Sequence, residues 1–139
     1  MKVKNVMHRG VTWVKPDTGL SAIARKMRVD DIGAVPVGED GRLIGMVTDR
    51  DIAIRGAAKS GDCAKLTAAD VMTKPIVCCR SEDELAHAVR VMERRKIRRL
   101  PVVDAKRQMV GMLSLGDVSR KAPKALAGEV IRAVSGHHR

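Results

Sequence analysis

The sequence predicts a mixed α/β (α+β) fold assembled from two copies of one structural unit. Residues recur 65 positions apart, so that Val6-Met7 returns as Val71-Met72. After one inserted residue the spacing becomes 66, as in Gly45-Met46 and Gly111-Met112. Each copy also carries a stretch with helical period followed by two short apolar runs. The apolar residues are mainly aliphatic, with one Trp and no Phe or Tyr, which suits helices layered on sheet.

Each copy begins with a predicted short strand and a helix. The strands are Val11 to Val14 and Ile76 to Cys79. In the helix that follows, four apolar positions recur at i, i+3, i+4 and i+7, which is the spacing of one buried helical face. These positions are Leu20, Ile23, Ala24 and Met27 in the first copy, and Leu85, Ala88, Val89 and Met92 in the second.

Two further strands and a closing helix complete each copy. Turn residues separate the two apolar runs of each pair, as expected for a hairpin. The predicted strands are Ala34 to Val37, Leu43 to Val47, Leu100 to Val103 and Met109 to Leu113. The predicted helices are Asp49 to Ala58, Leu115 onward and Ala122 to Val134. The order in each copy is therefore strand, helix, strand, strand, helix.

The chain length favours one globular unit made of two halves. A repeat of roughly 60 residues is marginal for an independent core, whereas 139 residues is the size of one ordinary domain. The predicted limits are 1–60 for the first repeat, 61–122 for the second, and 123–139 for a final helix and tail. The stretch 57–68 is a small, polar linker, and 136–139 is expected to fray.

Composition narrows the class of partner. The net charge of +11 and pI near 10.2 favour polyanions such as nucleotides, nucleic acid or an anionic membrane. No stretch is long and apolar enough to span a membrane, and no signal peptide opens the chain, so we expect a cytoplasmic protein without a membrane partner. Three cysteines, an odd number, agree with a reducing compartment.

The sharpest local motif occurs in both copies, where a strand ends in a hydroxyl residue and a carboxylate follows three positions later. These residues are Thr48 and Asp51 in the first copy, and Ser114 and Asp117 in the second. The spacing is that of a helix capping box. It also suits a polar clamp, because a carboxylate accepts two hydrogen bonds from a ribose diol. Spacing alone leaves both interpretations open.

A second motif is basic and occurs in one copy only. Arg98 and Arg99 directly precede a buried strand, where the first copy has Gly33 and Ala34. The arginines form either a solvated basic edge or a phosphate site, since guanidinium groups match phosphate oxygens.

The pattern of cysteines favours structural or incidental roles over a metal or redox site. Cys78 and Cys79 are adjacent on a predicted strand, so their side chains point to opposite faces. Cys63 lies in the linker, and the chain has no Cys-x-x-Cys.

Taken together, these motifs resemble those of a tandem pair of cystathionine-β-synthase (CBS) domains, often called a Bateman module. The resemblance covers residues 1–122 and rests on the order and duplication of Val-Met, Ile-x-x-x-Pro-Val and Gly-x-x-Thr/Ser-x-x-Asp, with the stretch Lys96 to Asp104. It is greatest to small stand-alone bacterial CBS pairs, including the hypoxic-response type. It implies two repeats packed about a pseudo-twofold axis with two clefts, which commonly bind AMP, ADP or ATP, and sometimes NAD or S-adenosylmethionine.

The resemblance also implies site residues. Asp51 and Asp117 would bind ribose hydroxyls in separate clefts, beside Thr48 and Ser114. The Asp51 cleft would be completed by Arg98, Arg99, Leu66 and Thr67. The Asp117 cleft would be completed by Ile32, Gly33, Ala34, Lys2 and Val3. The adenine would be walled by Val11, Thr12, Ile76 and Val77. Gly33 departs from Arg98 at the matching position of the second repeat, so position 33 offers no guanidinium group for phosphate in the Asp117 cleft.

The sequence therefore predicts a regulatory module, not an enzyme, with no obligatory cofactor and no metal. It would bind an adenine nucleotide, form a homodimer and signal to a separate effector protein by a population shift. One alternative is a nucleic-acid-binding protein, against which stand the scattered basic residues and the lack of aromatic platforms. The other is a redox or metal sensor using Cys63, Cys78 and Cys79.

Overall fold

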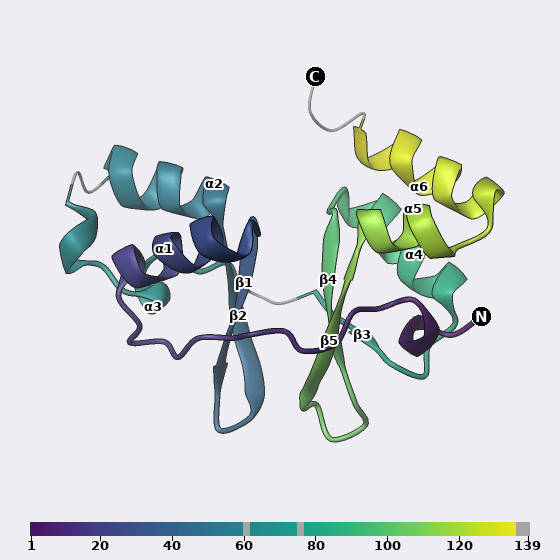
Figure 1. Cartoon of the computed structure of the whole chain (residues 1–139), viewed down its shortest axis with the longest axis horizontal. Coiled ribbons are helices and arrows are strands. Elements are labelled where there is room, and N and C mark those ends of the chain that lie inside the picture. The colour runs from purple at the N-terminus through teal and green to yellow at the C-terminus, as the bar shows by residue number, and fades with distance from the viewer. Residues whose placement is uncertain (60–61, 75–76, 136–139) are drawn as a thin grey trace. The chain divides into compact units, whose positions relative to one another are not determined.

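The computed structural model of the chain describes residues 1–59, 62–74 and 77–135, and it confirms a fold of mixed helices and strands. The chain forms two compact units (Figure 1). The first-repeat unit is Thr12–Ile76, and the second-repeat unit is Met1–Val11 together with Val77–Arg139. The compact units and the sequence repeats are different divisions of the chain, because the N-terminal segment packs with the second repeat. The limits 1–60, 61–122 and 123–139 stay a prediction.

The first-repeat unit contains a two-stranded antiparallel hairpin and its helices. Its elements are α1 (Leu20–Asp30), β1 (Ala34–Glu39), β2 (Arg42–Thr48), α2 (Asp49–Asp51), the π-helix η2 (Ile52–Ala58), the 3₁₀-helix η3 (Cys63–Lys65) and α3 (Ala68–Val71). The predicted helical face of α1 is confirmed at Leu20, Ile23 and Met27, which are buried, but Ala24 is exposed. The buried residues of α1 pack in one apolar core with Val35, Val37, Val47 and Val71.

The second-repeat unit contains a three-stranded sheet in the order β3-β4-β5. Its elements are η1 (Val3–Asn5), β3 (Cys79–Arg80), α4 (Leu85–Arg95), β4 (Arg99–Val103), β5 (Met109–Ser114), α5 (Leu115–Lys121) and α6 (Lys124–Ser135). All four predicted positions of α4 are buried. The N-terminal segment contributes Val3, Val6 and Met7 to the same core. The final helix predicted at 122–134 is confirmed as α6, and 136–139 lie outside the described residues.

The first predicted strand of each repeat is shorter than expected, and prolines explain why. Val14 makes a single parallel bridge to Val37, in which Val14 N–H donates to Pro36 O and Gly38 N–H donates to Val14 O. The next bonds along this ladder would need N–H groups from Pro36 and Pro16, and proline has none. The prediction of a strand at 11–14 is therefore wrong.

The same rule limits the equivalent strand of the second repeat. Cys79 pairs with Val102, and extension toward Val77 would need an N–H from Pro101. On the other side Ser81 N–H does reach Val103 O at 3.0 Å, because no proline occupies position 81. We predicted a strand at 76–79, whereas the structure has the shorter strand β3 at Cys79–Arg80. Ile76 lies outside the described residues.

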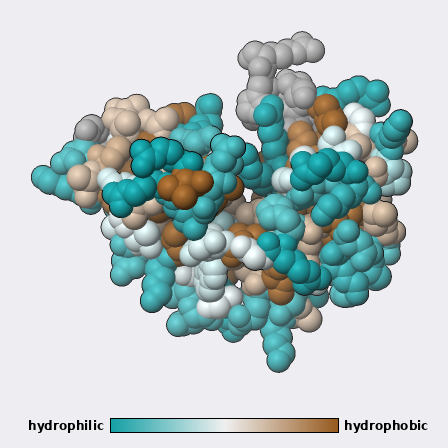
Figure 2. Space-filling view, viewed as in Figure 1, coloured by the Kyte–Doolittle hydropathy of each residue, from teal (hydrophilic) through white to brown (hydrophobic). Residues whose placement is uncertain are grey.

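On the face shown in Figure 2, hydrophilic residues predominate and apolar residues are interspersed among them. None of the helices described is long and apolar enough to cross a membrane.

Candidate ligand-binding half-sites

Both Thr/Ser-x-x-Asp motifs form complete capping boxes at the end of a strand. In the first-repeat unit, Asp51 N–H donates to Thr48 Oγ1 at 3.1 Å, and Thr48 N–H donates to Asp51 Oδ2 at 2.9 Å. In the second-repeat unit, the two reciprocal bonds between Ser114 and Asp117 are both 3.0 Å. The structural role of the motif is therefore confirmed in both repeats.

The two capping carboxylates have further partners and are buried. Asp51 is 7% exposed and accepts from Arg55 Nη1 at 2.8 Å and from Thr73 Oγ1 at 3.2 Å. A third capping box, between Thr67 and Asp70, offers a contrast because Asp70 is exposed. Capping alone thus does not require a buried acid.

The carboxylate of Asp117 has matching additional partners. Asp117 is 2% exposed, with Arg120 Nη2 at 3.0 Å from Oδ1 and His8 Nδ1 at 2.7 Å from Oδ2. Burial raises the pKa of Asp117, but the hydrogen bonds from His8 and Ser114 and the electrostatic interaction with His8 outweigh it and hold this pKa below its ordinary value. Asp117 is therefore an anion at neutral pH.

Sequence reasoning missed His8 and Thr73, which occupy equivalent positions. Each follows the duplicated Val-Met pair, 65 residues apart. His8 bridges to Met112 and Thr73 bridges to Met46, so the two segments cross the second hairpin strand of their units in the same way. The duplicated Val-Met pair could have drawn attention to His8 and Thr73, but no local pattern in the sequence links these residues to Asp117 and Asp51.

Basic side chains hold these segments in place. Arg55 Nη1 donates to Val71 O at 2.7 Å, and Lys121 Nζ donates to Val6 O at 3.3 Å. Arg55 and Lys121 are 66 positions apart, in agreement with the spacing of the second half of the repeat. The arrangement of acid, cap, Val-Met segment and basic residue is thus duplicated.

The partners of the carboxylates leave little capacity for a ligand. A carboxylate offers about four acceptor sites. Asp51 already accepts from Thr48, Thr73 and Arg55. A ribose diol needs two acceptor sites, so the half-exposed Arg55 must release Asp51 for such a ligand to bind. Arg120, which is more exposed than Arg55, must release Asp117 in the same way.

The residues before the first hairpin strand lie against the cap of their own unit. Asp49 N–H donates to Gly33 O at 3.0 Å, and Leu115 N–H donates to Arg98 O at 2.8 Å. In register, Ala34 faces Thr48 and Arg99 faces Ser114. The sequence prediction instead assigned Arg98 and Arg99 to the Asp51 cleft, and Ile32, Gly33 and Ala34 to the Asp117 cleft. These assignments join different units and stay predictions.

The remaining predicted site residues have mainly structural surroundings. Val3 is fully buried, and Leu66 and Val77 are partly buried against a core. Lys2 Nζ donates to Glu82 O at 3.1 Å, and Thr67 is the N-cap of α3. Two other residues were predicted to contact the adenine: Val11 is partly buried and Thr12 is exposed.

A groove of about 620 Å³ lies elsewhere in the first-repeat unit. It is lined by Trp13 to Asp17 and by Gly38 to Asp40, at the turn of the hairpin away from Thr48. The Trp13 ring packs so closely on Gly38 that a Cβ there would lie 1.8 Å from it.

Cys79 gives little support to a redox sensor. Cys79 is buried, and burial, with Asp83 and Cys78 nearby, raises the pKa of its thiol to about 12. A thiol with this pKa stays protonated at neutral pH and is a poor nucleophile. Across the described residues, no group of three His, Cys, Asp or Glu side chains could hold a metal ion.

Comparison with known proteins decides the family. The sequence model of the CBS domain matches residues 3–56 and 68–124, which is most of the chain and gives two copies. The chain belongs to the CBS domain family. This CBS pair is 36% identical over 132 residues to Hypoxic response protein 1 of Mycobacterium tuberculosis, covering 94% of this chain and 92% of that protein.

Solved structures of CBS pairs have the same fold. Hypoxic Response Protein I, crystallised with two coordinated zinc ions, matches with a TM-score of 0.81 and 36% identity over 88% of this chain and all of that one. CBSX2, a protein of Arabidopsis thaliana, in complex with AMP matches at 0.77 and 29% identity, covering 87% and 95%. The CBS pair of MJ0100 with 5-methylthioadenosine and S-adenosyl-L-methionine matches at 0.76 and 25%, covering 86% and 98%.

Proposed function

We propose that this CBS pair is a regulatory module that binds an adenine nucleotide, with AMP as the first ligand to test and ADP, ATP, NAD or S-adenosylmethionine as further candidates. The observation that carries the proposal is the duplicated half-site, in which a buried capping carboxylate lies beside the residues that precede the hairpin. Two CBS pairs of the same fold hold AMP or S-adenosylmethionine, which supports this ligand class.

Each carboxylate would accept hydrogen bonds from ribose hydroxyls. Asp51 and Asp117 are suited to this role because their capping boxes hold both carboxylates rigidly. Arg55 and Arg120 would leave the carboxylates as the ribose arrives, and could then turn toward phosphate. Arg98 and Arg99 supply the other guanidinium groups, next to Ser114.

The response to the ligand would be a shift in population. A nucleotide that binds better when Arg55 or Arg120 has released its carboxylate would favour that arrangement. We propose that a separate effector protein reads this change, and that the protein is a cytoplasmic homodimer without enzymatic activity.

Calorimetric titration with AMP tests the proposal. Asp51→Ala and Asp117→Ala should each weaken AMP binding at their own half-site by about 1.5–3 kcal/mol, which is roughly 10- to 150-fold, because a carboxylate acceptor is lost. If the acids serve only as caps, each variant loses about 0.5–2 kcal/mol of stability and its affinity stays unchanged. Asp70→Ala is the matched control, since it removes an exposed capping box.

Arginine variants separate phosphate binding from general charge. Arg99→Ala should weaken AMP far more than adenosine, and the loss should shrink as salt rises. Equal losses for adenosine and AMP would contradict the phosphate role of Arg99. No binding of AMP, ATP, NAD or S-adenosylmethionine at millimolar concentration would refute the nucleotide function itself.

A further inference from the structure

The end of α4 carries an uncompensated basic surface. Six of the ten residues from 90 to 99 are basic and one is acidic, a net charge of +5. The basic side chains are all exposed: Arg90, Arg94, Arg95, Lys96, Arg98 and Arg99. Within the described part of the chain, none of the six forms an ion pair. We call these six residues the α4 basic surface.

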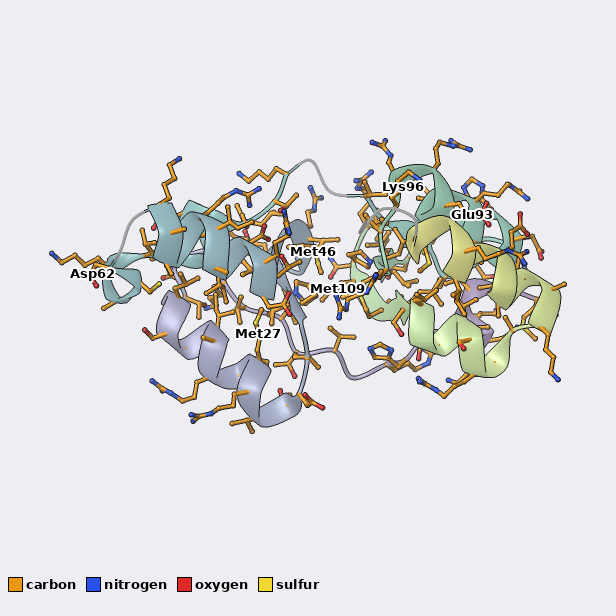
Figure 3. All side chains as sticks on the ribbon, turned by 90° about the horizontal axis from the view of Figure 1, so that it is seen from above. Met27, Met46, Asp62, Glu93, Lys96 and Met109 are labelled. Atoms are coloured by element: carbon orange, nitrogen blue, oxygen red, sulfur yellow. The ribbon has the colours of Figure 1, made fainter. Side chains whose placement is uncertain are left out.

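The geometry of α4 explains why this charge faces solvent. Arg90 and Arg94 are four residues apart, opposite the buried face of the helix. The acidic Glu93 is partly buried and lies near Glu129 of α6; Figure 3 labels Glu93 and also Lys96 at the end of α4. Glu93 therefore lies toward α6 and, among the described residues, forms no ion pair with the basic surface, where Arg90 is the one basic residue whose charge acts on it.

The first repeat shows that the fold does not need this charge. Residues 25–34 occupy the equivalent positions and contain three basic and two acidic residues, a net charge of +1. There Lys26 pairs with Asp30 at 3.1 Å. Helices α1 and α4 both have 11 residues, and each is followed by a C-cap residue with φ 54°, which is Asp31 in one and Lys96 in the other. The same helix and turn thus form with or without the basic surface.

We propose that the α4 basic surface binds the phosphate backbone of a nucleic-acid duplex. The apolar residues of this stretch, Val91, Met92 and Ile97, pack inward, so the surface lacks the apolar centre of a protein interface. Protein–DNA interfaces are polar and strongly positive. Two observations had counted against a nucleic-acid partner: the lack of aromatic platforms and the scattered basic residues. Binding to the phosphates of a duplex needs no aromatic platform. The α4 basic surface also gathers six basic residues in one stretch.

This surface is additional to the nucleotide half-sites. Arg98 and Arg99 are shared with the proposed nucleotide site, whereas Arg90, Arg94, Arg95 and Lys96 are not. A test that leaves Arg98 and Arg99 unchanged therefore separates the two proposals, and AMP titration of the same variant shows whether the nucleotide site is intact.

Fluorescence anisotropy with a labelled 20-base-pair DNA duplex tests this inference between 50 and 200 mM salt. The variant Arg94→Gln/Arg95→Gln/Lys96→Gln should bind at least tenfold more weakly than wild type at 50 mM salt. Its slope of log affinity against log salt should be smaller by up to about 2.7, because each phosphate contact contributes about 0.9. The control Arg25→Gln/Lys26→Gln/Arg28→Gln removes the same charge from α1 and should change affinity less than threefold.

Three results would overturn the inference. Equal losses in the two variants would mean that only net charge matters. No duplex binding by wild type at 50 mM salt would exclude a duplex partner. Binding to phosphatidylserine vesicles but not to the duplex would assign the surface to a membrane instead. Far-UV circular dichroism of each variant checks that the helices are retained.

Discussion

His8 and Thr73 show how one position can be filled differently in two equivalent half-sites. Each contacts the capping acid of its unit, at 2.7 Å for His8 and 3.2 Å for Thr73. The two half-sites have the same geometry, yet an imidazole contacts Asp117 and a hydroxyl contacts Asp51.

We predict that Asp117 makes the stability of the second-repeat unit sensitive to acid. Its folded pKa is lowered, so its contribution is present above the unfolded value of about 3.9 and is lost as pH falls through the folded value. Asp117→Asn should be less stable than wild type at pH 6, and this difference should narrow below about pH 4. Urea unfolding at pH 3 to 6 measures it.

Two variants control this experiment. His8→Thr copies the first repeat and should reduce the acid sensitivity, because a hydrogen bond that lowers the Asp117 pKa is exchanged for a neutral one. Asp70→Asn removes an exposed capping acid and should show a smaller pH-dependent effect. A difference between wild type and Asp117→Asn that stays constant from pH 3 to 6 would contradict the prediction.

Strands and helices differ in how much of them the sequence could predict. Helical spacing identified the buried face of α1 and α4, because tertiary packing follows the 3.6-residue period. The length of the first strand in each repeat was overestimated. Pairing there is limited by the missing N–H groups of Pro36 and Pro101, which lie on a neighbouring strand. The caps were readable from local spacing, but His8 lies 109 residues from Asp117, and such a contact depends on the fold.

Two equivalent glycines should respond differently to a methyl group. In β2, a Cβ at Gly45 would lie 2.5 Å from Met72 Sδ, which belongs to a flexible side chain. In β5, a Cβ at Gly111 would lie 2.8 Å from the backbone oxygen of His8 as well as 2.8 Å from Met7 Sδ. Gly111→Ala should therefore cost about 1–3 kcal/mol, and Gly45→Ala clearly less, as measured by chemical denaturation. Equal costs would mean that the Val-Met-His segment moves as easily as a side chain.

At the scale of the whole molecule, the described residues form two separate apolar cores. One is built around α1 and the other around α4, and each includes a Val-Met segment. Val71 belongs to the first-repeat unit and Val6 to the second, although Val6 lies at the opposite end of the chain from α6. The N-terminal segment is therefore structural: it fills a core and presents His8 to Asp117.

Val6→Ala and Val71→Ala are a matched pair that tests this division. Both valines are almost fully buried, at 0% and 1% exposure, and each substitution removes two methylene equivalents, or about 1.6 kcal/mol. Val71→Ala should speed hydrogen exchange mainly in residues 12–74, and Val6→Ala mainly in 77–135, because each core loses packing independently. Mass spectrometry of exchanged peptides resolves the two regions. If both variants accelerate exchange equally in both regions, the two cores open as a single cooperative unit, and a change at the N-terminus then reaches Asp51 as readily as Asp117.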